Sequence, residues 1–318
     1  MKSFRQLQQK LPSEFLERLQ SEYGPIKAEK IMNGMMTERP VTLRVNTLKT
    51  DTRTVMKVFQ NDGIKFDRVL WYNEALVLKN VRENDIADHP LYQDGHIYLQ
   101  SLSSMIPPLA LGPKPGEKVL DLTAAPGSKS TQMAALMQNQ GFILANEINE
   151  IRAERLKFNL EKQGVTIATV RLGDGKRLDE NFEQYFDSVL LDAPCGGEGL
   201  FLLNDPKTYR FWSGKKVREL SGEQKKLLRT ALWALKPGGT MVYSTCTLAR
   251  EENEAALDWS FERYANNLKS EPVNIPVPGA EPGFETEGPS NSHRQNFMRI
   301  YPSGLMEGFF VAKLRKIK

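Results

Sequence analysis

The sequence is poor in cysteine and histidine and has no long apolar run. Its 318 residues include two cysteines, too few for the disulfide framework of a small secreted protein. The three histidines, His89, His96 and His293, lack the spacing of zinc ligands, so we expect no metal. No apolar run approaches the roughly 18 residues of a membrane span, and the N-terminus lacks a signal-peptide pattern. These absences predict a cytoplasmic protein that binds no membrane.

The composition is that of an ordinary soluble protein. Hydrophobic residues make up 40% and charged residues 26% of the chain, which is enough apolar material for a sizeable core. The length suits one large domain together with a small one. The formal net charge of +4 is by itself weak evidence for a polyanionic partner.

Cations are concentrated in residues 207–229. This segment contains two glutamates, and the rings of Tyr209, Phe211 and Trp212 lie among its cations. Cations with stacking rings are typical of a nucleic-acid groove. The alternative is a solvated helix face with a few buried rings, and the segment alone leaves both open. Its cations are Lys207, Arg210, Lys215, Lys216, Arg218, Lys225, Lys226 and Arg229.

Residues 1–97 are expected to form a small N-terminal α+β domain. A helical pattern covers residues 1 to about 37, with a start signal at Pro12 and Ser13. The alternation of residues 41–45 predicts a strand whose outward face holds Arg44 and Asn46. A helix over 51–61 and strands over 67–71 and 75–80 complete the unit.

Residues 98–318 alternate strands with helices, the pattern of a parallel sheet with crossover helices. Strands are expected within 117–126, 141–147, 167–172, 186–194, 239–246, 296–301 and 308–315. Helices are expected over 128–138, 149–162, 221–235 and 251–264, and residues 272–292 read as a long loop. The fold class that this predicts is α/β, a doubly wound, mostly parallel seven-stranded sheet with the small α+β domain before it.

The residues that follow the strands predict a ligand site, because ligands of doubly wound sheets bind beyond the carboxyl ends of the strands. Glu147 follows the second strand at the place of a carboxylate that binds ribose hydroxyls, and Asp174 between two glycines suits an adenine amine. The fourth strand ends in Asp192-Ala193-Pro194-Cys195. The first is followed by a loop of small residues, Thr123, Ala124, Ala125, Pro126, Gly127, Ser128 and Lys129.

Each of these features alone is compatible with a plain turn or an exposed side chain. Together, the four strand ends predict a site for an adenosine-type cofactor. The glycine triplet that binds the phosphates of a dinucleotide is missing from the sequence. S-adenosyl-L-methionine therefore fits better than a dinucleotide.

The two cysteines, Cys195 and Cys246, both stand just past apolar runs of the expected sheet. A thiolate that adds to C6 of a pyrimidine turns C5 into a carbon nucleophile able to accept a methyl group. The adduct must then lose the C5 proton and expel the thiolate, and two cysteines facing one pocket could divide these tasks. For either cysteine taken alone, a small buried hydrophobe is the alternative.

The sequence resembles the Nol/Nop/Sun family of RNA cytosine-C5 methyltransferases, with a Rossmann-like S-adenosylmethionine-dependent domain. The resemblance covers nearly the whole chain and is carried by RVNTLK (44–49), YLQSLSSMIPPLAL (98–111), LDLTAAPGSKS, ANEIN, GDG, LDAPCGGEG, LKPGG, VYSTCTLAREENE and RIYPSGLMEGFFVAKL. It implies that Cys246 is the nucleophile, that Cys195 assists product release and that Asp192 binds the target base. It also implies that residues 123–129, Glu147, Arg152, Asp174 and Asp192 contact the cofactor.

Two positions depart from the family's usual C-A-A-P-G-G-K loop, because Thr123 and Ser128 replace a cysteine and a glycine. The expected partner is RNA, either ribosomal RNA, as in the RsmF-like bacterial branch that LPSEFLERLQSEYG resembles, or transfer RNA. RNA would be recognised by residues 1–97, the segment 207–229 and the terminal Lys313, Arg315, Lys316 and Lys318. We expect a monomer.

Two other functions are weighed against this one. The first is a non-catalytic RNA-binding or ribosome-assembly protein that keeps the fold. The second is a DNA cytosine methyltransferase. Enzymes of that class usually use the Pro-Cys after the fourth strand as nucleophile, so the additional Ser-Thr-Cys-Thr at Cys246 argues against it.

Overall fold

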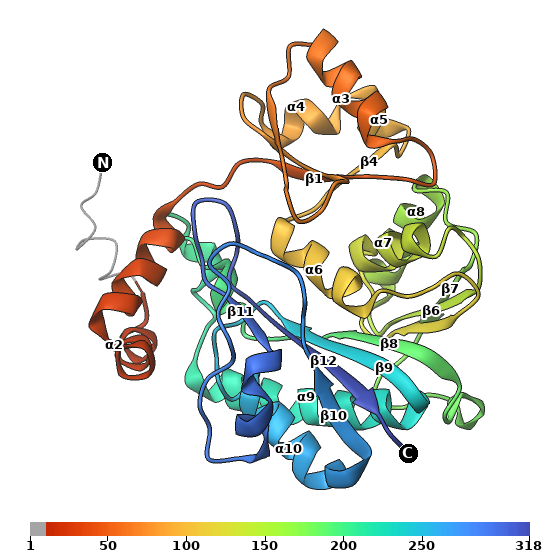
Figure 1. The fold of residues 1–318 in the computed structure, drawn as a ribbon. Coiled ribbons are helices and arrows are strands. Elements are labelled where there is room, and N and C mark those ends of the chain that lie inside the picture. Colours follow the sequence, from red (N-terminus) through yellow and green to blue (C-terminus); the bar gives the residue numbers. More distant parts are fainter. Residues whose placement is uncertain (1–10) are drawn as a thin grey trace.

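A computed structural model describes residues 11–318, which form a small sheet, a large sheet and a long N-terminal helix that precedes both (Figure 1). The helix, α2 (Ser13–Met36), begins at the predicted start signal and is broken at Gly24, which precedes Pro25. The part of the predicted helix that falls in residues 1–10 lies outside the described residues. A short linker connects α2 to the small sheet, so the N-terminal region has two parts.

The small sheet is antiparallel, with strand order β2-β3-β1-β4. Its buried residues include Leu43, Phe59 and Leu76, which form a core of their own. The predicted helix and strands of this region are present, and β4 adds a fourth strand at the junction with the large domain. The elements are β1 (Thr42–Val45), α3 (Thr52–Asn61), β2 (Phe66–Arg68), β3 (Ala75–Leu78), α4 (Glu83–Ala87), α5 (Pro90–Gln93) and β4 (Ile97–Leu99).

The prediction that Arg44 and Asn46 face solvent is wrong, because both side chains are buried. The face of the small sheet that carries them packs against the large domain. There Arg44 donates hydrogen bonds to Gln100 (Nε–Oε1 3.2 Å) and Thr131 (Nη2–Oγ1 3.0 Å). Asn46 Nδ2 donates to the carbonyl of Gln163 at 2.8 Å. The alternation is present, but the polar face meets protein and makes most of its hydrogen bonds there, while Arg44 Nη1 has no partner among the described residues.

The large sheet has eight strands, and seven of them follow the order β10-β12-β9-β8-β5-β6-β7 while β11 pairs with β12. The five strands from β7 to β9 are parallel, and β10, β11 and β12 add antiparallel pairs. The strands are β5 (Lys118–Asp121), β6 (Phe142–Glu147), β7 (Ala168–Leu172), β8 (Phe186–Asp192), β9 (Leu235–Thr245), β10 (Leu268–Glu271), β11 (Met298–Ile300) and β12 (Phe309–Lys316). The predicted doubly wound, mostly parallel fold is confirmed, and β10 is the strand that the sequence pattern missed.

Helices cover both faces of the large sheet. They are α6 (Leu102–Leu111), α7 (Ser128–Leu136), α8 (Glu150–Lys162), α9 (Gly214–Ala234) and α10 (Glu254–Tyr264), with 3₁₀ turns η1 (Glu180–Phe182), η2 (Glu198–Leu200), η3 (Pro206–Thr208), η4 (Ala265–Asn267) and η5 (Pro289–Asn296). Helix α9 begins at Gly214, seven residues earlier than predicted, because Ser213 Oγ accepts the Lys216 N–H and caps the helix. The predicted end before Lys236 is close to the observed end at Ala234.

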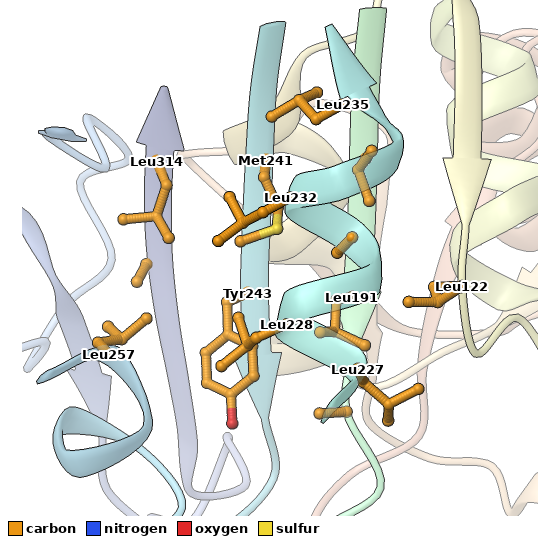
Figure 2. Close-up of a cluster of buried hydrophobic side chains, with 14 of the residues drawn as sticks. Leu122, Leu191, Leu227, Leu228, Leu232, Leu235, Met241, Tyr243, Leu257 and Leu314 are labelled. Atoms are coloured by element: carbon orange, nitrogen blue, oxygen red, sulfur yellow. The ribbon is translucent and has the colours of Figure 1, made fainter. Parts of the chain in front are cut away.

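The core between α9 and the sheet holds β8 and β9 in place (Figure 2). Leu228 and Leu232 of α9 lie over Met241 and Tyr243 of β9, and all four side chains are buried. Burying one such leucine is worth about 1.5–3 kcal/mol. This packing fixes the strands whose carboxyl ends carry Asp192 and Ser244.

Helix α2 belongs to the core of the large domain by its contacts. The Phe15 ring lies 5.1 Å from the Phe201 ring and 5.3 Å from the Trp212 ring, measured between centroids. Tyr209 and Trp212 are therefore buried, whereas Phe211 is 70% exposed. Of the three rings that suggested a nucleic-acid groove, two are core residues, as the alternative interpretation held.

The loop 272–292 is tied to α10 through a buried ion pair. Arg299 and Glu254 are almost fully buried, and Arg299 Nε donates to Glu254 Oε1 at 2.7 Å. The same carboxylate oxygen accepts the Phe284 N–H at 2.9 Å. Arg299 also donates to the Leu248 carbonyl, so one guanidinium joins the strand β11, the loop and the segment after β9.

Replacing Glu254 with alanine should destabilise the protein strongly. The Arg299 guanidinium would remain buried without its carboxylate, and breaking one partner of such a pair typically costs about 3–5 kcal/mol. Urea unfolding measures this loss. The control is Glu154→Ala, which breaks the exposed pair with Lys157 and should change the unfolding free energy by less than about 0.5 kcal/mol. Equal effects of the two substitutions on the unfolding free energy would contradict the stabilising role of the buried ion pair.

Candidate active site

The two cysteines meet beyond the carboxyl ends of β8 and β9. These strands are parallel neighbours, and their register pairs Asp192 with Ser244. Three residues past Asp192 and two past Ser244, Cys195 Sγ and Cys246 Sγ lie 3.1 Å apart, within hydrogen-bonding distance for sulfur. Both thiols are free and partly accessible. The structure therefore brings together two residues that are 51 positions apart in the chain.

The pKa of the Cys195 thiol is raised well above its ordinary value. The largest cause is the hydrogen bond with Cys246, followed by burial and by the negative charge of Cys246. Glu252 adds a smaller contribution of the same sign. These contributions keep the Cys195 thiol protonated at neutral pH, and either sulfur can be the donor of the hydrogen bond between the two thiols.

Asp192 is held by a serine and a lysine. Ser244 Oγ donates to Asp192 Oδ1 at 2.7 Å, and Lys129 Nζ lies 2.6 Å from Asp192 Oδ2. Lys129 is buried and also donates to Ser104 Oγ at 2.8 Å. Its ammonium thus points to the carboxylate beside the thiols, which places a fixed positive charge at the predicted base-binding residue.

A cavity of about 360 Å³ connects the strand ends. Of the predicted site residues, it is lined by Thr123, Ala125, Glu147, Arg152, Asp174, Asp192, Cys195 and Cys246. Ala124, Pro126, Gly127, Ser128 and Lys129 lie outside this lining. Gly127 has a φ of +106°, and a Cβ there would lie 2.9 Å from Leu156 Cδ1 on α8, so its smallness serves the packing of the loop.

Glu147 stands at the end of β6 with its carboxylate turned into this cavity. It is 3% exposed, and its Oε1 accepts the N–H of Asn149 at 2.9 Å. Arg152 Nη2 lies 3.4 Å from its Oε2 and donates to the Ala125 carbonyl at 2.9 Å. Arg152 therefore connects the carboxylate of β6 to the loop after β5, and the remaining acceptor positions of Glu147 are available for hydroxyl groups.

Asp174 lies on the loop after β7 and lines the same cavity as Thr123. Its Oδ1 accepts the backbone N–H of Lys176 at 2.9 Å, and Lys176 Nζ lies 3.7 Å from its Oδ2. Apolar side chains, Leu122 and Leu227, line the space between the polar groups. A cavity with a few fixed polar groups and an apolar lining is typical of a small-molecule site.

Several residues of the site were not predicted from the sequence. Lys176, Glu223 and Leu227 line the cavity, and Ser104 and Ser244 fix the ion pair of Lys129 with Asp192. They come from elements whose spatial neighbours the sequence does not reveal. Glu252 did have a signal, since it lies in the EENE that ends one of the family motifs.

Glu252 is buried behind Cys195. Its carboxylate accepts the Gly196 N–H at 2.9 Å and the Gln224 Nε2–H at 2.8 Å. Burial raises the pKa of Glu252 to about 8, although both hydrogen bonds act in the opposite direction. The carboxyl group therefore changes its charge near neutral pH, directly behind the thiol pair.

The parallel sheet, the cavity across its strand ends and the carboxylate at the end of β6 define a Rossmann-like methyltransferase. Residues 108–315 match the family described as 16S rRNA methyltransferase RsmB/F. Residues 11–83 match the family described as an RsmF/B-like methyltransferase, ferredoxin-like domain. The chain belongs to the RsmB/F family, which confirms the Nol/Nop/Sun, RsmF-like resemblance. The assignment also agrees with S-adenosyl-L-methionine as the expected cofactor.

Relatives at the sequence level include proteins named ribosomal RNA small subunit methyltransferase F. The protein of that name from Shewanella sp. (strain MR-4) is 39% identical over 280 residues, which are 87% of this chain and 56% of the relative. The one from Cronobacter sakazakii is 39% identical over 290 residues, covering 88% and 58%. The chain thus spans little more than half the length of these relatives.

Solved structures share the whole fold. A methyltransferase homolog from Pyrococcus horikoshii is 33% identical, with a TM-score of 0.84 over 98% of both chains. NSun6 from the same organism, solved with SFG, an analogue of S-adenosylmethionine, has a TM-score of 0.83 over 96% of this chain and 98% of that one. Its identity of 23% supports the fold alone.

Two kinds of feature are absent from residues 11–318. None of the helices in this part is long and apolar enough to cross a bilayer. No group of three or more His, Cys, Asp and Glu side chains in the same range is arranged to hold a metal ion. The cytoplasmic location and the monomeric state stay predictions.

Glu252 should make the stability of the protein depend on pH. Its pKa is about 8 in the folded state and near the ordinary 4.5 when exposed, so between these values the folded state keeps a proton that the unfolded state has lost. Raising the pH through this range therefore destabilises the fold, by at most about 1.4 kcal/mol per pH unit. Glu252→Gln removes this contribution. From pH 5 to pH 8, the unfolding free energy of Glu252→Gln should rise relative to that of the wild type. If the unfolding free energies of the two proteins change with pH in parallel, the raised pKa of Glu252 is contradicted.

Proposed function

We propose that the protein transfers the methyl group of S-adenosylmethionine to C5 of a cytosine in RNA, through a covalent bond between Cys246 and C6 of the base. The observation that supports this most directly is the pair of thiols 3.1 Å apart on the wall of the cavity that contains Glu147 and Asp174. A cofactor cavity that ends at two free cysteines suits a reaction that needs both a nucleophile and a base.

The cavity fits the cofactor in size and in polar groups. Its volume lies in the range of roughly 300–1,000 Å³ that is usual for ligand pockets. Glu147 would accept both ribose hydroxyls, and Asp174 would accept the exocyclic amine of adenine. When bound, S-adenosylmethionine supplies a methyl group on a positively charged sulfur, an electrophile for carbon.

The methyl transfer begins with Cys246. Its thiolate bonds to C6 of the cytosine, and the electron pair of the C5–C6 double bond becomes available at C5, with charge spread toward N3 and O2. Asp192 would hold the base near N3 and N4, its carboxylate accepting the N4–H, and the Lys129 ammonium beside it would stabilise the charge that spreads toward N3 and O2. C5 then bonds to the methyl group, and the electron pair of the broken carbon–sulfur bond stays on the donor sulfur.

Release of the product requires Cys195. Once Cys246 is bonded to C6, it carries no negative charge and its hydrogen bond with Cys195 is weakened, so two of the three largest causes of the raised Cys195 pKa are reduced, while burial remains. Cys195 can then lose its proton to solvent and take the proton from C5 as a thiolate. The electron pair of that C–H bond re-forms the C5–C6 double bond, and Cys246 leaves as a thiolate.

Replacing each cysteine with serine should give two different phenotypes. Cys246→Ser should reduce methyl transfer to RNA by at least about 10³-fold, because the nucleophile is lost. Cys195→Ser should retain adduct formation and accumulate protein bonded covalently to RNA. Denaturing gels with labelled RNA and tritium transfer from the cofactor measure both, and wild-type turnover in Cys246→Ser would refute the mechanism.

The RNA substrate that we propose is ribosomal RNA of the small subunit, because the relatives are named for it. Bisulfite sequencing of ribosomal and transfer RNA from cells with and without the gene separates the two candidate classes. If cells without the gene lose a 5-methylcytosine from transfer RNA alone, transfer RNA and not ribosomal RNA is the substrate. Recognition of RNA by the N-terminal domain, predicted as residues 1–97, is part of the same proposal.

The solvent face of α9 is the second surface proposed for RNA. Arg218 and Arg229 are exposed and form no ion pair within residues 11–318. Arg229 also lines a second cavity, of about 460 Å³, together with Trp233 and Tyr264. The terminal cations predicted for RNA are less available. Lys313 and Arg315 pair with Glu271, and Lys316 donates to backbone carbonyls. Lys318 is exposed.

Neutralising Arg218 and Arg229 should weaken RNA binding in a salt-dependent way. For the double variant Arg218→Gln, Arg229→Gln, the slope of log affinity against log salt should fall by about 0.7 for each phosphate of single-stranded RNA that is no longer neutralised. Fluorescence anisotropy at several salt concentrations measures the slope. The matched control is Arg155→Gln, Lys157→Gln on the exposed face of α8. Equal slopes for the two double variants would exclude α9 as an RNA surface.

A further inference from the structure

The peptide units on both sides of Cys195 are held by two buried polar side chains. Gln224 Nε2 donates to the Pro194 carbonyl at 2.9 Å, on one side of the cysteine. Glu252 accepts the Gly196 N–H on the other side, at 2.9 Å to Oε2 and 3.2 Å to Oε1. Gln224 and Glu252 are fully buried, and a hydrogen bond of 2.8 Å joins them. The backbone around the thiol is thus held at two points, the Pro194 carbonyl and the Gly196 N–H, by two side chains that are joined to each other.

This network connects Cys195 to the strand that carries Cys246. Gln224 lies on α9, whereas Glu252 lies in the segment after β9, and Tyr243 of β9 donates from its hydroxyl to the Glu252 carbonyl at 2.5 Å. A Cβ on Gly196 would lie 2.8 Å from Glu252 Oε1, so the loop approaches the carboxylate as closely as a glycine allows. The position of one thiol relative to the other therefore depends on these contacts.

We propose that Gln224 and Glu252 are positioning residues for Cys195, which hold its thiol against Cys246 and thereby set the rate of product release. The proposal rests on the proposed function. Neither side chain is expected to touch the base or the cofactor methyl group. We expect their main effect on the step in which Cys195 removes the C5 proton, because both hydrogen bonds are made to the peptide units next to Cys195, whereas Cys246 directly follows β9.

The physical reason is the sensitivity of proton transfer to geometry. A displacement of about 1 Å at a reacting group can cost on the order of 100-fold in rate. Without Gln224 Nε2, the Pro194 carbonyl and the Glu252 carboxylate would be left with an unpaired acceptor inside the protein. The loop from 194 to 196 would then shift to find other partners, and Cys195 would move with it.

The test uses Gln224→Met, which keeps the length and shape of the side chain and removes both donated hydrogen bonds. Its matched control is Gln163→Met. Gln163 is also buried, also donates from Nε2, to the Ile97 carbonyl at 3.2 Å, and its Oε1 likewise has no partner among the described residues. Both variants therefore remove a buried amide that donates to a backbone carbonyl, one behind Cys195 and one at the small sheet.

Purified wild type, Gln224→Met, Gln163→Met and Cys195→Ser are incubated with S-adenosylmethionine and labelled RNA transcript of the small ribosomal subunit. For Gln224→Met we expect turnover to fall about 10- to 100-fold, the covalently trapped fraction to rise at least about fivefold above wild type, and the cofactor Kd to change less than about twofold. Gln163→Met should match the wild type in the trapped fraction. Glu252→Gln keeps an acceptor for the Gly196 N–H and should be intermediate, and Glu252→Ala should resemble Gln224→Met.

Each outcome has one meaning. If Cys195→Ser traps RNA but Gln224→Met does not, the positioning role is refuted and the proposed function stands. If both glutamine variants change the trapped fraction equally, the effect is general destabilisation, and the proposal is likewise refuted. If neither wild type nor Cys195→Ser ever forms a covalent complex with the RNA while cofactor binds normally, it is the proposed function that fails.

Discussion

The pairing of β8 with β9 is the constraint on which the rest of the site depends. Parallel neighbours end at the same edge of a sheet, and the register of Asp192 with Ser244 brings the two following loops side by side. The hydrogen bond between the same two side chains makes the register part of the chemistry. Leucines of α9 pack on one face of both strands (Figure 2). Because this packing fixes the strands, it also contributes to the distance between the two sulfur atoms that follow them.

Much of this could be predicted from the sequence, because strand ends in a doubly wound sheet converge whatever the details of their packing. Glu147, Asp174, Asp192 and both cysteines follow apolar runs, and the structure places all five on one cavity. The order of the strands in the sheet could not be predicted from the sequence in this way. The crossover helices set that order, and the loops that follow two strands become neighbours only when the strands are adjacent.

The errors have physical reasons of their own. Arg44 follows a polar-outside alternation, yet its polar face meets a second domain, and periodicity does not distinguish protein from water. Helix α6 was not predicted, because it contains Pro107 and Pro108, which usually indicate a break in a helix. Strand β10 was not predicted because it has only four residues. Lys129 was expected at the cofactor because of its loop, and its ammonium lies beside Asp192; its contact with the cofactor stays a prediction.

Hydrogen bonds from Arg44 and Asn46 attach the small sheet to the large domain. Helix α2, which precedes the small sheet in the chain, packs on the large domain through Phe15 and Trp212. Both ends of the N-terminal region are thus attached to the large domain, and these contacts oppose its rotation relative to the thiols. We expect the distance between the small sheet and the thiols to be the same before and after substrate arrives. Under the proposed function, an RNA bound by the small sheet would have to bring its target base to the thiols while the spacing between the two domains stays constant.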